Sequence, residues 1–185
     1  MIQVNIADYI VQVGESMPER DDPDCARAAL VERFGSEWES EQRYHGFHGW
    51  HDLHVEVRWA SPWPFLCVGQ QYERKGGGYP GVLLVPETAV LFIGAGERLL
   101  AYDLRGPTRL WEDQADAGFH GWQRHEDLVV MSAELELAAW DLGGVKRWSA
   151  FVEPPWGYHV ESGTVHLDVM GTVSSFPLWV GPSHA

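Results

Sequence analysis

The chain is poor in cysteine, in basic residues and in long apolar runs, and each shortage excludes a class of protein. Only Cys25 and Cys67 are present among 185 residues, too few for a disulfide framework. No uncharged apolar run approaches membrane-spanning length, and the N-terminus lacks the basic start and apolar core of a signal peptide. We therefore expect a soluble, cytoplasmic protein that contacts no membrane, in which Cys67, within FLCVG, behaves as a small core residue.

Basic residues are also scarce relative to acidic ones. The sequence holds 13 Lys and Arg against 27 Asp and Glu, a formal net charge of −14. A surface of this sign repels the phosphates of nucleic acids and of anionic lipids. Residues 15–41 are especially acidic, a pattern that usually marks a solvated face. The charge favours a basic protein as partner and argues against nucleic acid.

The N-terminal part predicts strand and then helix. Residues 2–13 are consistent with one or two short strands. Asp22 can cap a helix and Pro23 suits its first position. Apolar residues follow at helical spacing, so we expect a helix near residues 23–43, packed against the sheet through Ala26, Leu30 and Phe34.

From about residue 54 onward, short apolar segments alternate with Gly, Pro, Asp and Ser, the pattern of antiparallel hairpins. The fold class we expect is mainly β: an antiparallel meander of blade-like hairpins, in an open or stacked sheet, with one N-terminal helix. The chain is interpreted as a single domain, 1–185, with strand and acidic helix in 1–43 and a β-rich repeat region in 44–185. The predicted strands are 54–59, 65–72, 81–85, 90–94, 99–104, 127–132, 136–142, 147–152, 164–170 and 173–179.

The strongest internal pattern is a repeat. Residues 90–109 align without a gap on residues 128–147, at a shift of 38, with seven identities in twenty positions. Asp103 and Asp141 are among these identities, and each precedes a Gly turn. A period near forty with this order of strands and turns is typical of a propeller blade. The core we expect is Leu91, Leu99, Ala101, Leu104, Val130, Leu137, Ala139, Leu142 and Val169.

Within the repeat, AYDLRGPTRLW and AWDLGGVKRW resemble the Ala-x-Asp-x-x-Thr-Gly-x-x-x-Trp blade motif of quinoprotein-type β-propellers. The resemblance covers residues 90–152 only. It lacks the Thr, both glycines come one residue early, and no quinone-binding residue is carried across. A closed ring of four forty-residue blades would consume nearly everything after the predicted helix. The resemblance therefore implies blade-like hairpins, and residues 158–180 could supply a degenerate copy.

Histidine recurs at every third position of HGFHGWHDLH, residues 45–54, and FHGW returns at 119–122. The favoured interpretation is a repeated lead-in to a strand, in which imidazoles satisfy backbone groups. In a strand, third neighbours point to opposite faces, so four ligands in line are not expected. The alternative is a metal-dependent enzyme whose imidazoles converge with nearby carboxylates on zinc or iron. Its candidate ligands are His51, His54, His120 and His125.

Three functions follow from these patterns. The first is a non-catalytic module for binding a basic protein, such as an immunity or inhibitor protein; the second is the metal-dependent enzyme; the third is a Trp-mediated binder of sugars or small ligands. No catalytic residue or cofactor is predicted, since no Gly-x-Ser-x-Gly elbow is present. The residues expected to bind the partner are Glu37, Glu39, Glu41, Trp63 and Trp156.

Overall fold

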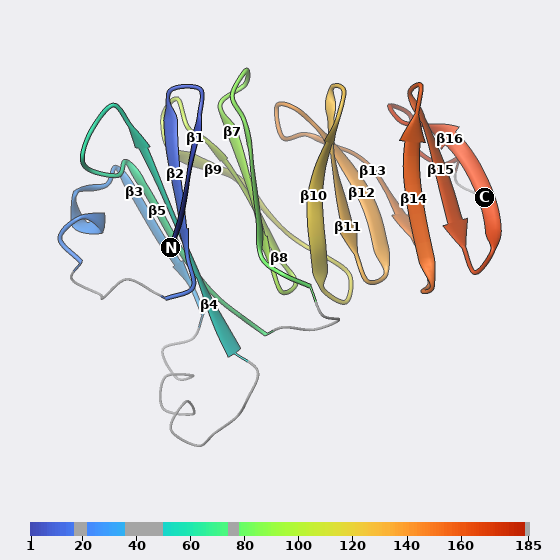
Figure 1. Ribbon diagram of the computed structural model, residues 1–185, viewed down its shortest axis with the longest axis horizontal. Helices are drawn as coiled ribbons and strands as arrows, with labels where there is room; N and C mark the ends of the chain where they lie inside the picture. Colours follow the sequence, from blue (N-terminus) through green and yellow to red (C-terminus); the bar gives the residue numbers. More distant parts are fainter. Residues whose placement is uncertain (17–21, 36–49, 74–77, 184–185) are drawn as a thin grey trace.

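The computed structural model describes residues 1–16, 22–35, 50–73 and 78–183, and within these ranges nearly all regular structure is strand (Figure 1). The strands form four separate sheets. The first sheet contains β1 (Ile2–Ile6), β2 (Tyr9–Gly14), β4 (Trp50–Trp59), β5 (Leu66–Glu73) and β3 (Leu30–Phe34), in that order. The second sheet contains β6 (Gly81–Val85), β7 (Val90–Ala95), β8 (Arg98–Asp103) and β9 (Thr108–Gln114).

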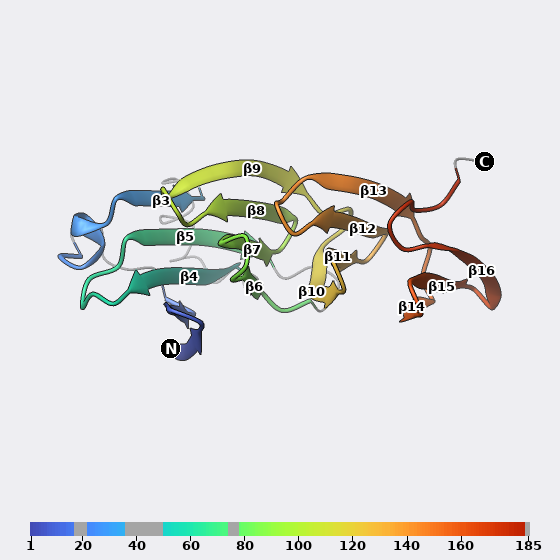
Figure 2. The same ribbon diagram turned by 90° about the horizontal axis from the view of Figure 1, so that it is seen from above.

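The remaining strands continue the same plan. The third sheet contains β10 (Phe119–His125), β11 (Leu128–Ala133), β12 (Glu136–Asp141) and β13 (Lys146–Phe151), and the fourth contains β14 (Trp156–Glu161), β15 (Thr164–Val169) and β16 (Thr172–Pro177). Within each of the last three sheets, strands that follow one another in sequence pair antiparallel. Figures 1 and 2 show the four sheets side by side in chain order, as propeller-like blades that do not close into a ring.

Three apolar layers hold this stack together, one between each pair of neighbouring sheets. Strand β7 shows the principle, since all six of its residues are buried. Leu91 and Ile93 pack toward the first sheet, while Val90 and Phe92 pack toward the third. An inner sheet with two covered faces therefore needs apolar residues at successive positions rather than at alternate ones.

The predicted repeat is present as two equivalent hairpins. Val90 pairs with Asp103 in β7–β8, and Leu128 pairs with Asp141 in β11–β12, so the register repeats at the predicted shift of 38. In both sheets the fourth strand, β9 or β13, then carries a bulge, opposite the steps Ala101–Tyr102 and Ala139–Trp140. Of the expected core, seven residues are buried, whereas Leu142 and Val169 are only partly so.

The N-terminal helix is not found. Asp22 does accept the backbone N–H groups of Asp24 and Cys25, at 2.8 and 3.4 Å, but the turn that follows is a single 3-10 turn, η1 (Cys25–Arg27). Leu30 and Phe34 lie in β3 instead, which pairs parallel with β5. The burial of LVERF alternates with period two, and pairing with an available edge strand overrode its helical spacing. Residues 36–43 of the predicted helix lie outside the described residues.

Several other expectations need correction. Strands β9, β10 and β14 were not predicted, and Cys67 is bonded to Cys25 in a disulfide rather than being a free core thiol. The segments that follow the two FHGW stretches are not equivalent, because His51-Asp52-Leu53 lies inside β4 whereas Glu126-Asp127 forms the turn from β10 to β11; residues 47–49 lie outside the described residues. Within the described ranges, no helix has the length and apolar character needed to cross a membrane.

Candidate functional site

A groove lies between the first and second sheets, where the last residues of β5 meet the turn between β7 and β8. Its volume is about 200 Å³, and its lining comes from both sheets. This is room for a side chain rather than for a large cofactor. The lining residues are Trp50, Gln70, Gln71, Tyr72, Glu73, Ala95, Glu97, Arg98 and Gln114.

The shape of the groove depends on how closely the two sheets meet. Gly96 has a φ of +58°, and a Cβ there would lie 3.0 Å from Cβ of Tyr72 and 3.1 Å from the carbonyl oxygen of Glu73. Gly is therefore needed both for the left-handed backbone and for the close approach. Across the same boundary, the Gln70 side-chain amide donates to the carbonyl oxygen of Ala95 at 2.7 Å.

One polar atom of a residue that lines this groove lacks a hydrogen-bond partner among the described residues. Gln70 is buried, with 1% of its surface exposed, and its Oε1 has no hydrogen-bond donor among the described residues. Leaving a buried acceptor unpaired costs about 1–3 kcal/mol. A ligand N–H group would recover that cost after a small movement at the groove that exposes Oε1, which is covered in this structure.

Acidic side chains rim the groove. Glu73 and Glu97 are exposed at its rim. The basic residue of the lining, Arg98, has its Nε 3.0 Å from Oε1 of Glu112 and its guanidinium over the ring of Phe34. A neighbouring hollow shares Glu97 and adds Asp116, extending the acidic rim. Trp50, 46% exposed, supplies an aromatic face on which a cation can bind.

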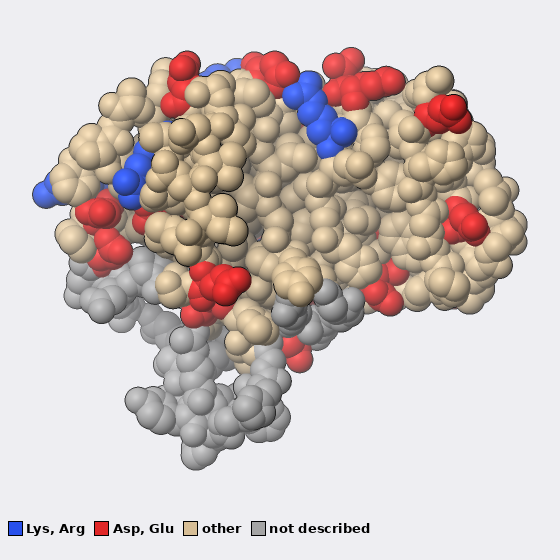
Figure 3. Space-filling view, viewed as in Figure 1, with Lys and Arg blue, Asp and Glu red and all other residues tan. Residues whose placement is uncertain are grey.

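Several basic side chains of the described surface are paired with carboxylates, and the surplus of acid comes from the composition, 27 Asp and Glu against 13 Lys and Arg. Arg58, Arg105, Arg124, Lys146 and Arg147 each lie within 4 Å of a carboxylate oxygen. Figure 3 shows one face, on which Asp and Glu gather around the rim and Lys and Arg are few. The surplus of acid is therefore not offset by a basic patch on that face.

The structure places the predicted partner-binding residues in different surroundings. Glu37, Glu39 and Glu41 lie outside the described residues. Trp63 is 41% exposed, with the Arg27 guanidinium 4.1 Å from its ring. Trp156 is half-buried: its indole N–H donates to the carbonyl oxygen of Glu134 at 2.9 Å, and its ring packs between the third and fourth sheets.

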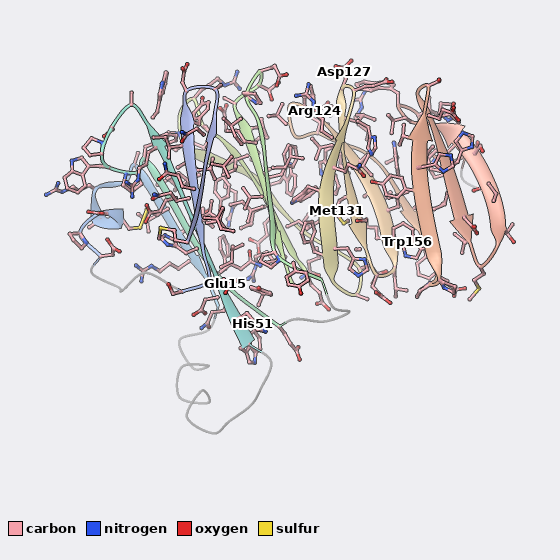
Figure 4. All side chains as sticks on the ribbon, in the orientation of Figure 1. Glu15, His51, Arg124, Asp127, Met131 and Trp156 are labelled. Carbon is pink, nitrogen blue, oxygen red and sulfur yellow. A yellow bond between two sulfur atoms is a disulfide. The ribbon has the colours of Figure 1, made fainter. Side chains whose placement is uncertain are left out.

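The four predicted metal ligands are not brought together. Figure 4 shows His51 at one end of the strands and Arg124, the neighbour of His125, at the opposite end. His51 packs on Tyr72, His120 lies 3.1 Å from a carboxylate oxygen of Glu134, and His125 packs on Tyr158. Burial lowers the pKa of His125 and raises the pKa of Tyr158 to about 12. These imidazoles serve local contacts.

Two clusters of ligating side chains form instead, and the first of them contains one predicted ligand, His54, with cysteines that sequence reasoning did not assign to a metal site. His54 lies in a buried group with Glu56, Cys25 and Cys67, and an exposed group on the fourth sheet contains His159, Glu161 and His166. In the second group, His159 and His166 pair directly across β14 and β15. The spacing His-x-Glu within a strand places both side chains on one face, and this pattern occurs at 54–56 and at 159–161.

Comparison with known proteins gives only remote likenesses. No family model matches the chain, and no curated protein matches its sequence. The computationally designed Ika4 protein superposes with a TM-score of 0.43 at 15% identity, covering 57% of this chain and 69% of that one. Hsv2p of Kluyveromyces lactis gives 0.41 at 11% identity, covering 70% and 43% of the two chains. BamB from Moraxella catarrhalis gives 0.38 at 13% identity, covering 70% and 47%. The chain thus spans less than half the length of Hsv2p and of BamB.

Proposed function

We propose that this protein is a non-catalytic module that binds a basic protein partner, in the manner of an immunity or inhibitor protein, and that the groove between its first and second sheets receives an arginine or lysine side chain. The observation that carries the proposal is the buried, unpaired Oε1 of Gln70 in a groove rimmed by Glu73 and Glu97. An acceptor without a donor among the described residues favours a ligand that brings N–H groups, and the net charge of −14 favours a ligand that is positively charged.

The remaining features fit the same partner. Trp50 offers an exposed aromatic face beside the carboxylates, and aromatic residues are enriched among the anchors of protein interfaces. The acidic surface would steer a basic partner toward the groove and speed its association. We place this activity in the cytoplasm, a compartment whose thiol pools keep most cysteine pairs reduced.

A peptide titration tests the proposal with a defined probe. An Arg-Gly repeat peptide and a Glu-Gly repeat peptide of equal length would be titrated calorimetrically into the protein at low salt. We expect binding of the Arg peptide alone. Trp50→Ala and Glu97→Gln should each weaken that binding by about tenfold, because truncating an anchor residue costs more than about 1 kcal/mol.

The matched controls lie elsewhere on the surface. Trp59→Ala changes another exposed tryptophan, and Glu161→Gln changes a carboxylate on the fourth sheet. Both should leave the affinity unchanged. Equal weakening by the control and groove variants would mean that only the overall charge matters, and would remove the groove from the proposal.

A further inference from the structure

Two ionisable side chains are buried beside the disulfide between Cys25 and Cys67. His54 is 4% exposed and Glu56 is 5% exposed, in the middle of β4. Burying a carboxylate and an imidazole is costly unless both are well paired. A disulfide needs neither group, so packing around it does not explain why they are there.

The four side chains are spaced like the ligands of one metal ion. Sγ of Cys25 lies 3.7 Å from Nε2 of His54, which lies 3.6 Å from Oε1 of Glu56. All four ligand atoms, including that of Cys67, lie within 4.8 Å of one another. Zinc bonds of about 2.3 Å to sulfur and about 2.0 Å to nitrogen or oxygen place tetrahedral ligand atoms roughly 3.3–3.8 Å apart.

We propose that reduction of the Cys25–Cys67 disulfide turns this cluster into a zinc site with the ligands Cys25, His54, Glu56 and Cys67. A dithiol reductant supplies two electrons and two protons: the protein S–S bond breaks, two thiols form, and the reductant becomes a disulfide. Zn²⁺ then displaces both thiol protons into solvent. With four protein ligands and no open position, the site is structural rather than catalytic.

The surroundings of the cluster suit this ion. Thiolate and imidazole are ligands that zinc favours over calcium or magnesium. Nη2 of Arg58 donates to Oε2 of Glu56 at 2.7 Å, which leaves Oε1 directed at His54 and adds a positive charge near three anionic ligands.

The site also has a structural role to perform. Cys25 belongs to the 3-10 turn before β3, Cys67 lies in β5, and His54 and Glu56 lie in β4. Either the disulfide or the metal would tie the N-terminal turn to the middle of the first sheet. Reduction would exchange one cross-link for the other rather than releasing the turn.

Zinc and cobalt binding to the full chain test this proposal. His166→Gln would be present in every sample to remove the exposed group formed with His159 and Glu161. After anaerobic reduction with a water-soluble phosphine, dialysis and elemental analysis should give one zinc per chain. The oxidised protein should retain none, and Co²⁺ should give the absorption of a tetrahedral thiolate complex only after reduction.

Single variants separate the ligands from their neighbours. Cys67→Ser and His54→Gln should abolish the thiolate spectrum or weaken zinc binding at least 100-fold. His51→Gln, three residues earlier in β4, should change neither the spectrum nor the affinity. Arg58→Gln should weaken binding about tenfold, the effect expected for a residue that positions a ligand. Circular dichroism of each variant would verify that the sheets persist.

Three results would overturn the proposal: equal zinc binding by the oxidised and reduced protein, full binding by Cys67→Ser, or a cobalt spectrum without thiolate character. If Cys67→Ser does not fold, Glu56→Gln on the reduced protein takes its place, since it keeps the shape of the side chain. Undiminished zinc affinity in that variant would remove Glu56 from the site.

Discussion

Single aspartates fix the turns of the repeat. Oδ1 of Asp141 accepts the backbone N–H groups of Gly143 and Val145, at 3.0 and 2.9 Å. Oδ1 of Asp103 accepts the backbone N–H of Arg105 at 2.9 Å, and its carboxylate also binds the Arg105 guanidinium. Side chains of this type commonly close turns in this way.

Replacing these aspartates should therefore destabilise the protein. We expect Asp103→Ala and Asp141→Ala each to lower the free energy of unfolding by about 1 kcal/mol or more, with the larger loss at Asp141, which satisfies two N–H groups. Urea denaturation measures the change. Glu153→Ala, at an exposed position outside the turns, should stay within about 0.5 kcal/mol of the parent chain. Unchanged midpoints in both Asp variants would contradict this assignment.

At the scale of the strands, a tryptophan in the last strand of each repeat makes a hydrogen bond from its own sheet to the next sheet. The indole N–H of Trp111 in β9 donates to the carbonyl oxygen of Gly144 in the third sheet's outer turn, at 2.5 Å. The indole N–H of Trp148 in β13 donates to the carbonyl oxygen of Leu178, just after β16, at 2.7 Å. The same residue of the motif thus makes the same kind of link twice.

Replacement by phenylalanine separates this hydrogen bond from the aromatic packing. Trp148→Phe should lower the free energy of unfolding by about 1–3 kcal/mol, because the buried carbonyl oxygen of Leu178 loses its donor. Trp111→Phe should cost less, since its site is only partly buried. Trp59→Phe, at a 54% exposed position, is the control and should be nearly neutral. Thermal unfolding followed by circular dichroism gives the comparison, and a loss at Trp148 no greater than at Trp59 would refute the link.

The sequence predicts best the elements whose residue pattern fits only one type of secondary structure. The repeat fixed the hairpins β7–β8 and β11–β12, because their apolar positions and Asp-Gly turns recur together. β3 was missed because Leu30, Glu32 and Phe34 fit a strand as well as a helix, and only its pairing with β5 decides. β9 and β10 were missed because their half-exposed polar residues carry no apolar alternation.

At the scale of the whole molecule, the candidate groove could not be predicted from sequence. Trp50, Gln70 and Glu97 come from β4, β5 and the turn after β7, and they meet only because the first sheet packs on the second. No local sequence pattern indicates which sheets pack against each other. The acidic surplus is a property of composition and was predictable, whereas the unpaired Oε1 of Gln70 depends on the packed structure.

If the whole protein is a charge-steered binder, residues that attract the partner and residues that hold it should separate kinetically. We expect charge reversal of Glu37, Glu39 and Glu41 to slow association with the basic partner and to flatten its salt dependence, with little effect on dissociation. Trp63→Ala should chiefly speed dissociation, because an exposed aromatic anchor acts after encounter. Trp156→Ala should do the same if Trp156 contacts the partner.

Surface plasmon resonance measures both rates, on a partner captured from cell extract with and without 0.5 M salt, at which the screening length falls to about 4 Å. Trp156 needs a stability control, because its indole N–H binds Glu134 and its ring packs against the third sheet. Thermal unfolding of Trp156→Ala would reveal whether faster dissociation only reflects a loosened fourth sheet. Trp63 stacks on Arg27 at the surface and makes the cleaner test. If neither the glutamate substitutions nor added salt changes the association rate, the acidic surface has no role in recognition. Electrostatic steering must weaken when the charge is reversed or screened.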